Sequence, residues 1–340
     1  MLMTASHSAV TIASRRAPST LLRLVGAGIF AAVMAPGSAM AETYPSRAVT
    51  LVVPFAAGGG TDSIAREIAT HLKKSLGQTV VVENQGGGGG VIGASRVANA
   101  QADGYTLLLV TSTFVTHAAV DKSVPYDVSK SFSPIALLGR GPLLVVVNKK
   151  LPVNTIGDLV KQAKADPQSL NFASAGPGSI NHLSGELFNQ LASTKMTHIP
   201  YKGSGPATFD LLSGAVQVFF ATAPTMLGHV KTSEVKLLAT TGAERSRLFP
   251  DTPTVKEAGV GTFEVYTWWG VVGPANLPPS IVEKLNAAVN EVVALNSVQQ
   301  RFTGEGAETF RGAPNKLAET ISTELAHWRK LVASAGIKTQ

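Results

Sequence analysis

Apolar runs alternate with amphipathic stretches along most of the chain, which is the pattern of strands that alternate with helices. Residues 48–53 form an apolar, β-branched run, and Ile64, Ile68 and Leu72 recur at helical spacing after it. The alternation continues to a third apolar run at 106–110. Strands that are apolar throughout and alternate with helices predict a parallel sheet covered on both faces.

A long apolar segment at 137–147 separates this first α/β unit from a second one, and a similar segment at 265–272 leads back. Two α/β units joined by two crossings leave a cleft between them, where small molecules collect near the carboxyl ends of the strands. The pattern therefore predicts an α/β fold with two lobes and a central ligand cleft. We expect one lobe at 42–140 and 261–340, and the other at 141–260.

The other predicted elements follow the same rhythm. We expect a strand at 79–83 and a helix up to about residue 100 in the first unit, and in the second unit strands at 170–173, 197–200, 216–220 and 235–239. The expected helices lie at 155–165, 180–191, 207–213, 225–230, 279–295 and 316–335.

The N-terminal stretch differs from the rest of the chain. Residues 1–41 contain Arg15, Arg16 and Arg23 but no acidic residue, and an apolar run at 24–35 leads to Ala39-Met40-Ala41. This order of a basic, an apolar and a small-residue region is the plan of a secretory signal peptide, and the run of about twelve apolar residues is too short to span a bilayer. We therefore expect an exported, periplasmic protein that starts near Glu42.

Composition removes several classes of function. The chain has no cysteine, which excludes disulfides, thiolate metal sites and cysteine nucleophiles. Basic residues are not clustered with aromatic ones, so we expect no nucleic-acid partner. The histidines of the exported part show no metal-ligand spacing. We expect neither a metal nor a cofactor.

Glycine-rich turns between strands and helices are the strongest local signal. The turn 54–62 contains Gly58, Gly59 and Gly60 directly before a helix. Free N–H groups and the dipole at a helix start favour an anion such as a carboxylate. The small-residue turns at 174–179 and 201–207 repeat this arrangement in the second unit, with Ser179 as the expected helix cap. Turns from both lobes could converge on one anion.

Two sequence patterns suggest an enzyme instead of a binding protein. Gly88, Gly90 and Gly93 match a dinucleotide fingerprint, but no acidic residue follows the next strand at its expected place. Ser179 and His182 could form a nucleophile and base on one helix, although a cap and a helix-face histidine explain them as well. We expect no catalytic residues and no enzyme activity.

Several short segments of the exported part together form a specific pattern. They are Tyr44-Pro45-Ser46-Arg47, Pro54–Gly59 with Asp62, Val82–Gln85, Asp103–Thr106, His198–Gly203, Pro253–Val255 with Glu257–Gly259, and Trp268–Pro274. In these segments, which follow in order over nearly all of the exported part, the chain resembles the Bug family, the TctC-like receptors of tripartite tricarboxylate transporters.

The resemblance implies the two-lobed periplasmic binding protein fold (type II-like) with two interdomain crossovers. It also implies a small carboxylate ligand and a two-subunit membrane permease as partner, and we expect a monomer. A ligand carboxylate in this family meets the first and fifth strand–helix turns, which here match 55–59 and either 174–179 or 201–205. The candidate ligand-binding residues are Phe55, Ala57, Gly58, Gly59, Asn84, Thr111, Ser112, Thr113, Ser174, Gly178, Ser179, Tyr201, Lys202, Gly203, Ser204, Thr222 and Trp268.

One departure from the family pattern bears on the ligand. Amino-acid-binding relatives carry an aspartate after the strand that here ends at Phe219-Phe220, whereas this chain has Ala221-Thr222-Ala223. A buried ammonium would lack a partner, so we expect a dicarboxylate or an aromatic carboxylate instead of an amino acid. Strand alternation would turn one of Trp268 and Trp269 towards the cleft. A ligand-sensing receptor for a membrane signalling partner is the alternative function.

Overall fold

One mixed β-sheet connects all the strands of the structure. The computed structural model describes residues 44–167, 169–304 and 306–335. Its strands are β1 Val49–Val53, β2 Val80–Asn84, β3 Thr106–Thr111, β4 Phe132–Asn148, β5 Asn171–Ser174, β6 Thr197–Pro200, β7 Val218–Thr222, β8 Val235–Thr240, β9 Tyr266–Pro274 and β10 Glu308–Thr309. They follow the order β2-β1-β3-β9-β4-β7-β5-β6, and β8 and β10 also pair with β4.

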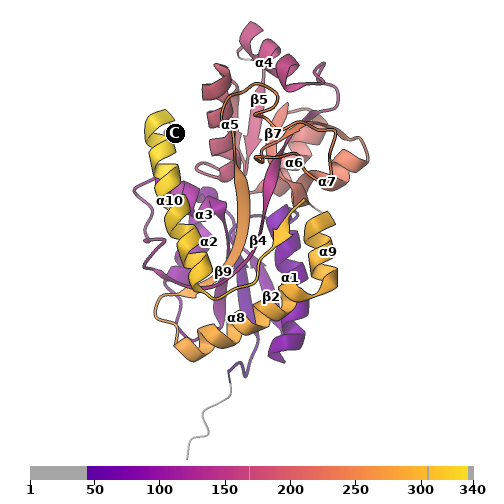
Figure 1. The fold of residues 1–340 in the computed structure, drawn as a ribbon. Helices are drawn as coiled ribbons and strands as arrows, with labels where there is room; N and C mark the ends of the chain where they lie inside the picture. Colours follow the sequence, from indigo (N-terminus) through magenta and orange to yellow (C-terminus); the bar gives the residue numbers. More distant parts are fainter. Residues whose placement is uncertain (1–43, 168, 305, 336–340) are drawn as a thin grey trace, which may run out of the picture. The chain divides into compact units, whose positions relative to one another are not determined.

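Helices cover the sheet in each half of the molecule (Figure 1). They are α1 Gly60–Leu76, the short 3₁₀ turn η1 Gly88–Gly90, α2 Val91–Ala98, α3 Ser112–Val120, α4 Ile156–Ala165, α5 Ile180–Ala192, α6 Ser204–Ser213, α7 Ala223–Lys231, α8 Pro279–Ala294, α9 Asn296–Gly304 and α10 Asn315–Ala335. Among the described residues, no helix is both long and apolar enough to cross a membrane.

The first lobe is built around β2, β1 and β3, which are parallel to one another. The apolar stripe of α1 is buried, as its spacing predicts, at Ile64, Ile68 and Leu72. The helix ends at Gly77, whose φ of 71° is a left-handed conformation that glycine adopts without steric cost. The carboxyl ends of β1 and β3 therefore point the starts of α1 and α3 towards the same edge of the sheet.

The second lobe is built around β7, β5 and β6, which are again parallel. Helix α4 begins with a capping box in which Thr155 and Asp158 satisfy each other's backbone N–H groups. Helix α5 begins after Ser179, whose hydroxyl accepts a hydrogen bond from the N–H of His182. Both starts agree with the sequence patterns.

Two long strands connect the lobes. The first part of β4, Phe132–Pro142, pairs with β9, and the part from Leu143 onwards pairs with β7 and β8. Strand β9 returns to the first lobe and pairs antiparallel with β3 on its other side. Figure 1 shows β4 and β9 side by side between the group α1, α2 and α8 and the group α4 to α7. These are the two predicted crossings, and they make the sheet mixed instead of purely parallel.

Buried side chains fill both lobes and the region of the crossing strands. One apolar cluster in the first lobe includes Leu51 and Val289, and another in the second lobe includes Leu211 and Phe219. A third cluster contains Val52 from the first lobe together with side chains of the second lobe. The apolar core is thus continuous through the crossing strands.

The predicted order of strands and helices is confirmed, with shifts of a few residues at most ends. Strand β4 starts at Phe132, before the predicted 137, and α3, α9 and β10 were not predicted. Strand β4 changes partners between Pro142 and Leu143, close to the lobe boundary expected after residue 140, although the boundaries themselves remain a prediction. The predicted signal peptide, 1–41, lies outside the described residues.

Candidate functional site

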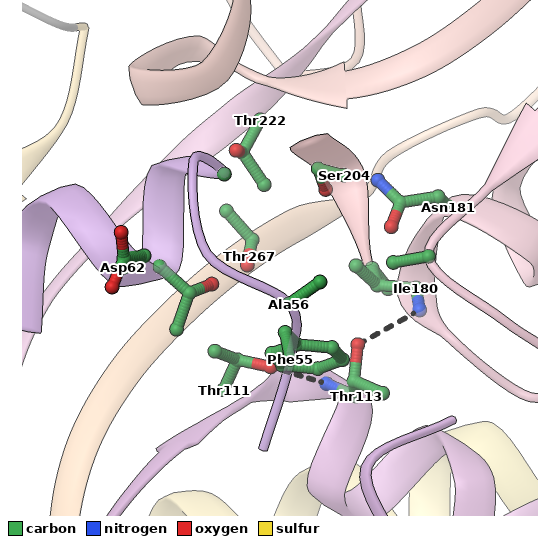
Figure 2. A pocket seen from close by; sticks show the side chains of 13 residues that line it. Phe55, Ala56, Asp62, Thr111, Thr113, Ile180, Asn181, Ser204, Thr222 and Thr267 are labelled. Carbon is green, nitrogen blue, oxygen red and sulfur yellow. Dashed lines mark hydrogen bonds between the residues drawn. The ribbon is translucent and has the colours of Figure 1, made fainter. Parts of the chain in front are cut away.

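A pocket lies where the strand–helix turns of both lobes meet (Figure 2). The first lobe contributes the β1–α1 turn and the β3–α3 turn, the second lobe contributes the starts of α5 and α6 and the end of β7, and Thr267 comes from the crossing strand β9. The free volume is about 20 Å³, which is room for about one water molecule. The pocket is lined by Phe55, Ala56, Gly59, Thr61, Asp62, Thr111, Thr113, Ala175, Ile180, Asn181, Ser204, Thr222 and Thr267.

Backbone groups of the two lobes bond directly to each other around this pocket. The N–H of Ala56 donates to the carbonyl of Lys202 at 3.0 Å, and the N–H of Gly60 donates to Thr225 Oγ1 at 3.0 Å. On the other side, Thr116 Oγ1 donates to the carbonyl of Gly178 at 2.7 Å. The lobes are therefore closed on each other.

Glycine makes this close approach possible. Gly89 has a φ of 62°, and a Cβ atom there would collide with the carbonyl of Pro177 in the other lobe. A Cβ atom on Gly205 would lie 2.6 Å from the carbonyl of Ala57. Larger residues at these positions would hold the lobes apart, because backbone atoms cannot move aside as a flexible side chain can.

Asp62 is the only acidic residue among the described residues that line the pocket, and its charge is already balanced. Its carboxylate accepts hydrogen bonds from Arg66 at 3.1 Å, from Asn84 Nδ2 at 3.0 Å and from the N–H of Gly58 at 3.1 Å. Burial alone would raise the pKa of Asp62, but these hydrogen bonds and the Arg66 charge together lower it below its usual value. Asp62 therefore stays ionised and paired.

Hydroxyl groups dominate the rest of the lining. Thr61, Thr111, Thr113, Ser204, Thr222 and Thr267 each place a hydroxyl in or beside the pocket, and Asn181 adds an amide. Figure 2 shows Thr111 and Thr113 beside Phe55, with Ser204, Asn181 and Thr222 on the opposite side. Lysine and arginine do not occur among the described lining residues. The described lining combines hydroxyls with apolar side chains, and it presents no unpaired charge.

Buried histidines support the β5–α5 turn behind the pocket. His182 Nδ1 accepts a hydrogen bond from the N–H of Gly178 at 3.1 Å, and His198 Nε2 lies 2.6 Å from Ser174 Oγ. The rings of His182 and His198 stack with centroids 3.9 Å apart, and a Cβ atom on Gly178 would approach His117. No group of side chains among the described residues is arranged to hold a metal ion.

These histidines are held neutral. Burial and, to a lesser extent, the charge of a neighbouring histidine together lower the pKa of His182 to about 4 and that of His198 to about 3. Burial also lowers the pKa of His117, although Asp121 acts in the opposite direction. A proton on His182 Nδ1 would face the N–H of Gly178, so the shape of the β5–α5 turn depends on a neutral ring.

Part of the predicted ligand-binding set lines the pocket, namely Phe55, Gly59, Thr111, Thr113, Ser204 and Thr222. Ala57 and Gly58 lie in the same β1–α1 turn but are exposed. Asn84 lies behind Asp62 and also donates to the carbonyl of Phe55.

The other predicted residues lie near the pocket without lining it. Ser112 is buried behind it and donates to Thr267 Oγ1, while Ser174, Gly178 and Ser179 shape the β5–α5 turn through the contacts above. Tyr201 donates to Asp210 Oδ2 at 2.6 Å, and Gly203 precedes α6. Tyr201 and Lys202 line a separate groove with Gly88, Gly89, Pro177, Pro200 and Pro206.

The expectation that one tryptophan faces the cleft is not met. Trp268 is 3% exposed and Trp269 is 1% exposed, and each belongs to an apolar core cluster on its own face of the sheet. Strand β9 is central, with β3 on one side and β4 on the other, and its two faces pack against different apolar clusters. Alternation therefore buries both rings.

The sequence interpretation missed several lining residues. Thr267 precedes the two tryptophans on β9, and Asn181 follows the cap of α5, but neither position carries a local signal for binding. Asp62 enters the sequence interpretation only through the family pattern, whereas in the structure it lines the pocket and accepts from the N–H of Gly58. The remaining additions are Ala56, Thr61, Ala175 and Ile180.

The geometry also bears on the hydrolase alternative. Ser179 Oγ accepts from the backbone N–H of His182, and the imidazole Nδ1 accepts from Gly178. The pair therefore forms the helix cap and turn support described above, without the contact between hydroxyl and imidazole that a nucleophile and its base require.

A two-lobed α/β fold that closes on a pocket between its lobes is the architecture of the periplasmic binding proteins to which the chain is similar. Residues 64–337 match the model of the "Tripartite tricarboxylate transporter family receptor", TctC, and the chain belongs to this family. Its relatives are binding proteins and not enzymes.

Individual relatives agree with this assignment. The chain is 38% identical to protein BugT of Bordetella pertussis over 321 residues, which covers 94% of this chain and 98% of BugT. It is similar to the structure of the periplasmic binding protein BugD, with a TM-score of 0.85, 36% identity, and coverage of 87% of this chain and 100% of BugD.

Two similar structures hold carboxylates. R. palustris Rpa4515 with adipate has a TM-score of 0.84 and 37% identity, and the match covers 87% of this chain and 99% of that one. MatC from Rhodopseudomonas palustris with bound malate has a TM-score of 0.82 and 35% identity, covering 85% and 100%.

Because these histidines are neutral in the folded protein, we expect its free energy of unfolding to depend on pH. In the unfolded chain a histidine takes up a proton near its ordinary pKa of 6.5, whereas in the folded protein the pKa of His182 is about 4. Between these values the unfolded state binds more protons, so the free energy of unfolding should decrease as the pH falls from 6.5 towards 4. Urea unfolding across this range measures the slope.

A variant at His182 separates the contribution of this residue to the pH dependence from that of the other titratable groups. His182→Asn keeps an acceptor for the N–H of Gly178 but cannot take up a proton in this range, so its stability should depend less steeply on pH. An unchanged slope in this variant would mean that His182 is not held neutral by the fold.

Proposed function

We propose that this chain is a periplasmic solute-binding receptor that captures a small carboxylate for a tripartite tricarboxylate-type membrane transporter. The observation that carries the proposal is the pocket between two lobes, whose described lining offers hydroxyls, an amide and a helix start in place of lysine or arginine. An anion fits such a site because hydrogen bonds to a charged group are stronger than those between neutral groups.

The start of α1 is the main source of backbone donors. Gly59, Thr61 and Asp62 line the pocket, so the first turn of this helix of 17 residues faces it. The first N–H groups of a helix have no partner within the helix, and the dipole adds partial positive charge there. The N–H of Gly60 already donates to Thr225 Oγ1, so the donors proposed for the ligand are the N–H groups of Thr61 and Asp62. These two features favour a carboxylate at the β1–α1 turn. The adipate and malate in two similar structures support a carboxylate ligand.

The charge balance argues against an amino acid as ligand. Asp62 is the only carboxylate in the described lining, and Arg66 already neutralises it. Thr222, at the end of β7, offers only a hydroxyl. An ammonium group enclosed here would lack an ionic partner, which is costly in a buried site. The ligand is therefore a carboxylate without an amino group.

Binding requires that the lobes separate and close again. The free volume of about 20 Å³ does not admit a carboxylate of several carbon atoms, so the ligand enters an open form. A ligand that contacts both lobes binds the closed form better and shifts the population towards it. The permease would then recognise the closed receptor.

The location and the partner complete the proposal. Residues 1–41 are a signal peptide that directs the protein to the periplasm, where it acts as a monomer and delivers its ligand to a two-subunit permease. The lobes correspond to 42–140 with 261–340, and to 141–260. Family membership supports the permease partner.

A thermal-shift screen of the purified protein tests the proposed function. We expect small carboxylates without an amino group to raise the unfolding temperature, and glutamate and aspartate to leave it unchanged. At a hundredfold excess over the dissociation constant, binding adds about 2.7 kcal/mol to the stability. The proposal fails if no carboxylate in the screen stabilises the protein, and the charge argument fails if glutamate or aspartate binds tightly.

A matched pair of glycine variants tests closure. The Cβ atom of Gly89→Ala would collide with the Pro177 carbonyl of the other lobe. Gly88 has a similar φ of 56°, but the Cβ atom of Gly88→Ala would meet only Val91, at an ordinary distance. We expect Gly89→Ala to weaken carboxylate binding by roughly tenfold or more, because a clash of about 1–3 kcal/mol opposes the closed form. Gly88→Ala should bind nearly as the unaltered protein does in calorimetric titration. Equal losses in both variants would assign the effect to backbone strain instead of closure.

A further inference from the structure

A groove that is separate from the pocket lies on the seam between the two lobes. The first lobe contributes the glycines of η1, and the second lobe contributes the β5–α5 turn, the end of β6 and the start of α6. The groove has a free volume of about 430 Å³, and none of its described lining residues also lines the pocket. It is lined by Gly88, Gly89, Pro177, Pro200, Tyr201, Lys202 and Pro206.

The groove is complete only while the lobes are closed. The N–H of Ala56 in the first lobe donates to the carbonyl of Lys202 in the second lobe at 3.0 Å. Gly89 lies so close to Pro177 that a Cβ atom on it would be 2.3 Å from the Pro177 carbonyl. Separation of the lobes would break these contacts and divide the groove into two halves. A partner that binds across the groove therefore binds the closed form better than the open form.

Most of the groove wall is apolar and rigid. Three of its seven lining residues are prolines, which have almost no side-chain entropy to lose when a partner binds. The hydroxyl of Tyr201 donates to Asp210 Oδ2 at 2.6 Å, which holds the ring in place. Phe209 lies on the same face of α6 as Pro206 and is 72% exposed, more than any other large apolar side chain among the described residues. Exposed aromatic side chains beside an apolar surface are typical of protein interfaces.

The exposure of the groove favours a protein partner over a small molecule. Four of its seven lining residues are exposed, namely Gly88, Pro200, Lys202 and Pro206. A site for a small molecule encloses most of the surface of its ligand, and an open groove does not. The occupant of the groove is therefore a segment of a larger molecule.

Lys202 determines the charge that this segment should carry. It is the only charged residue in the described lining of the groove. Its ammonium group forms no ion pair or hydrogen bond with another residue in the part of the chain that the structure describes. A carboxylate on the partner would complement this charge and fix the orientation of the segment.

We propose that the groove is the docking surface for an extracytoplasmic loop of the membrane permease, in which an apolar side chain fills the groove and a neighbouring carboxylate pairs with Lys202. The inference rests on the proposed function and adds how the permease recognises a loaded receptor. Membership of a family of transporter receptors supports this choice of partner. Because the ligand and the permease both favour the closed form, each increases the affinity of the receptor for the other.

Transport into proteoliposomes tests the docking surface. The two-subunit permease of the same organism is reconstituted, and the receptor is added outside at increasing concentrations. The transported probe is radiolabelled malate or adipate, whichever calorimetry shows to bind. Its concentration is kept far above the dissociation constant of each variant, so that every receptor is loaded. The receptor concentration that gives half of the maximal rate then reports the affinity of the loaded receptor for the permease.

Phe209→Ser and Lys202→Glu change the surface in two independent ways. Each should raise the half-saturating receptor concentration by roughly tenfold or more, because the first removes an aromatic contact and the second opposes the carboxylate of the partner. Lys202→Gln removes the charge without reversing it and should have a smaller effect. The effect of Lys202→Glu should decrease as the salt concentration rises, whereas that of Phe209→Ser should not.

Leu191→Ser and Lys195→Glu are the matched controls in the same lobe. Leu191 in α5 is 38% exposed, and Lys195 is exposed before β6, at the opposite end of this strand from Pro200. Neither is among the described residues that line the groove. Both controls should give the half-saturating concentration of the unaltered receptor. Urea unfolding and calorimetry verify that each variant is folded and binds the carboxylate.

The outcomes separate the docking surface from the proposed function. An increase in both Phe209→Ser and Lys202→Glu that is absent from the controls supports the surface. An unchanged half-saturating concentration in either variant, or an equal increase in its control, would overturn the surface while the receptor function stands. If the unaltered receptor binds the carboxylate but drives no transport, the proposed delivery to a permease is itself overturned.

Discussion

A buried hydrogen-bond donor must find an acceptor, and the lobes of this protein bring several donors together around one pocket in the part of the chain that the structure describes. The first turn of α1 and the hydroxyls of Thr111, Thr113 and Thr267 all face this pocket. The rest of the fold serves this arrangement. The parallel strands bring the turns to one edge of the sheet. The crossing strands connect the two lobes, because β9 pairs with both β3 and β4, and β4 pairs with both β9 and β7.

Charge is kept out of the pocket by pairing or by neutralisation. Arg66 compensates Asp62, and burial keeps His182 and His198 unprotonated behind the β5–α5 turn. A fixed cation in the pocket would hold an anion strongly but with little discrimination, whereas oriented neutral donors favour an anion whose oxygens match their positions. The site therefore combines affinity for negative charge with a geometric requirement on the ligand.

The sequence predicted the features that depend on local chemistry. The three-glycine turn before α1, the Ser179 cap and the apolar stripe of α1 all follow from rules that act over a few residues. Thr267 and Asn181 could not be found in this way, since what makes them line a pocket is the packing of β9 and α5 against the other lobe. The prediction that one tryptophan faces the cleft failed for the same reason. Strand alternation assigns Trp268 and Trp269 to opposite faces of the sheet, but it does not show that both faces are covered.

The most direct test of the account is whether a carboxylate closes the lobes. The chain has no cysteine, so Ile92→Cys in α2 and Phe209→Cys in α6, both exposed, provide two unique sites for spin labels in different lobes. Pulsed electron spin resonance then measures the distance between the labels with and without saturating malate or adipate. We expect the bound ligand to shift the distribution to a shorter and narrower distance. A distribution unchanged by a carboxylate that calorimetry shows to be bound would contradict it.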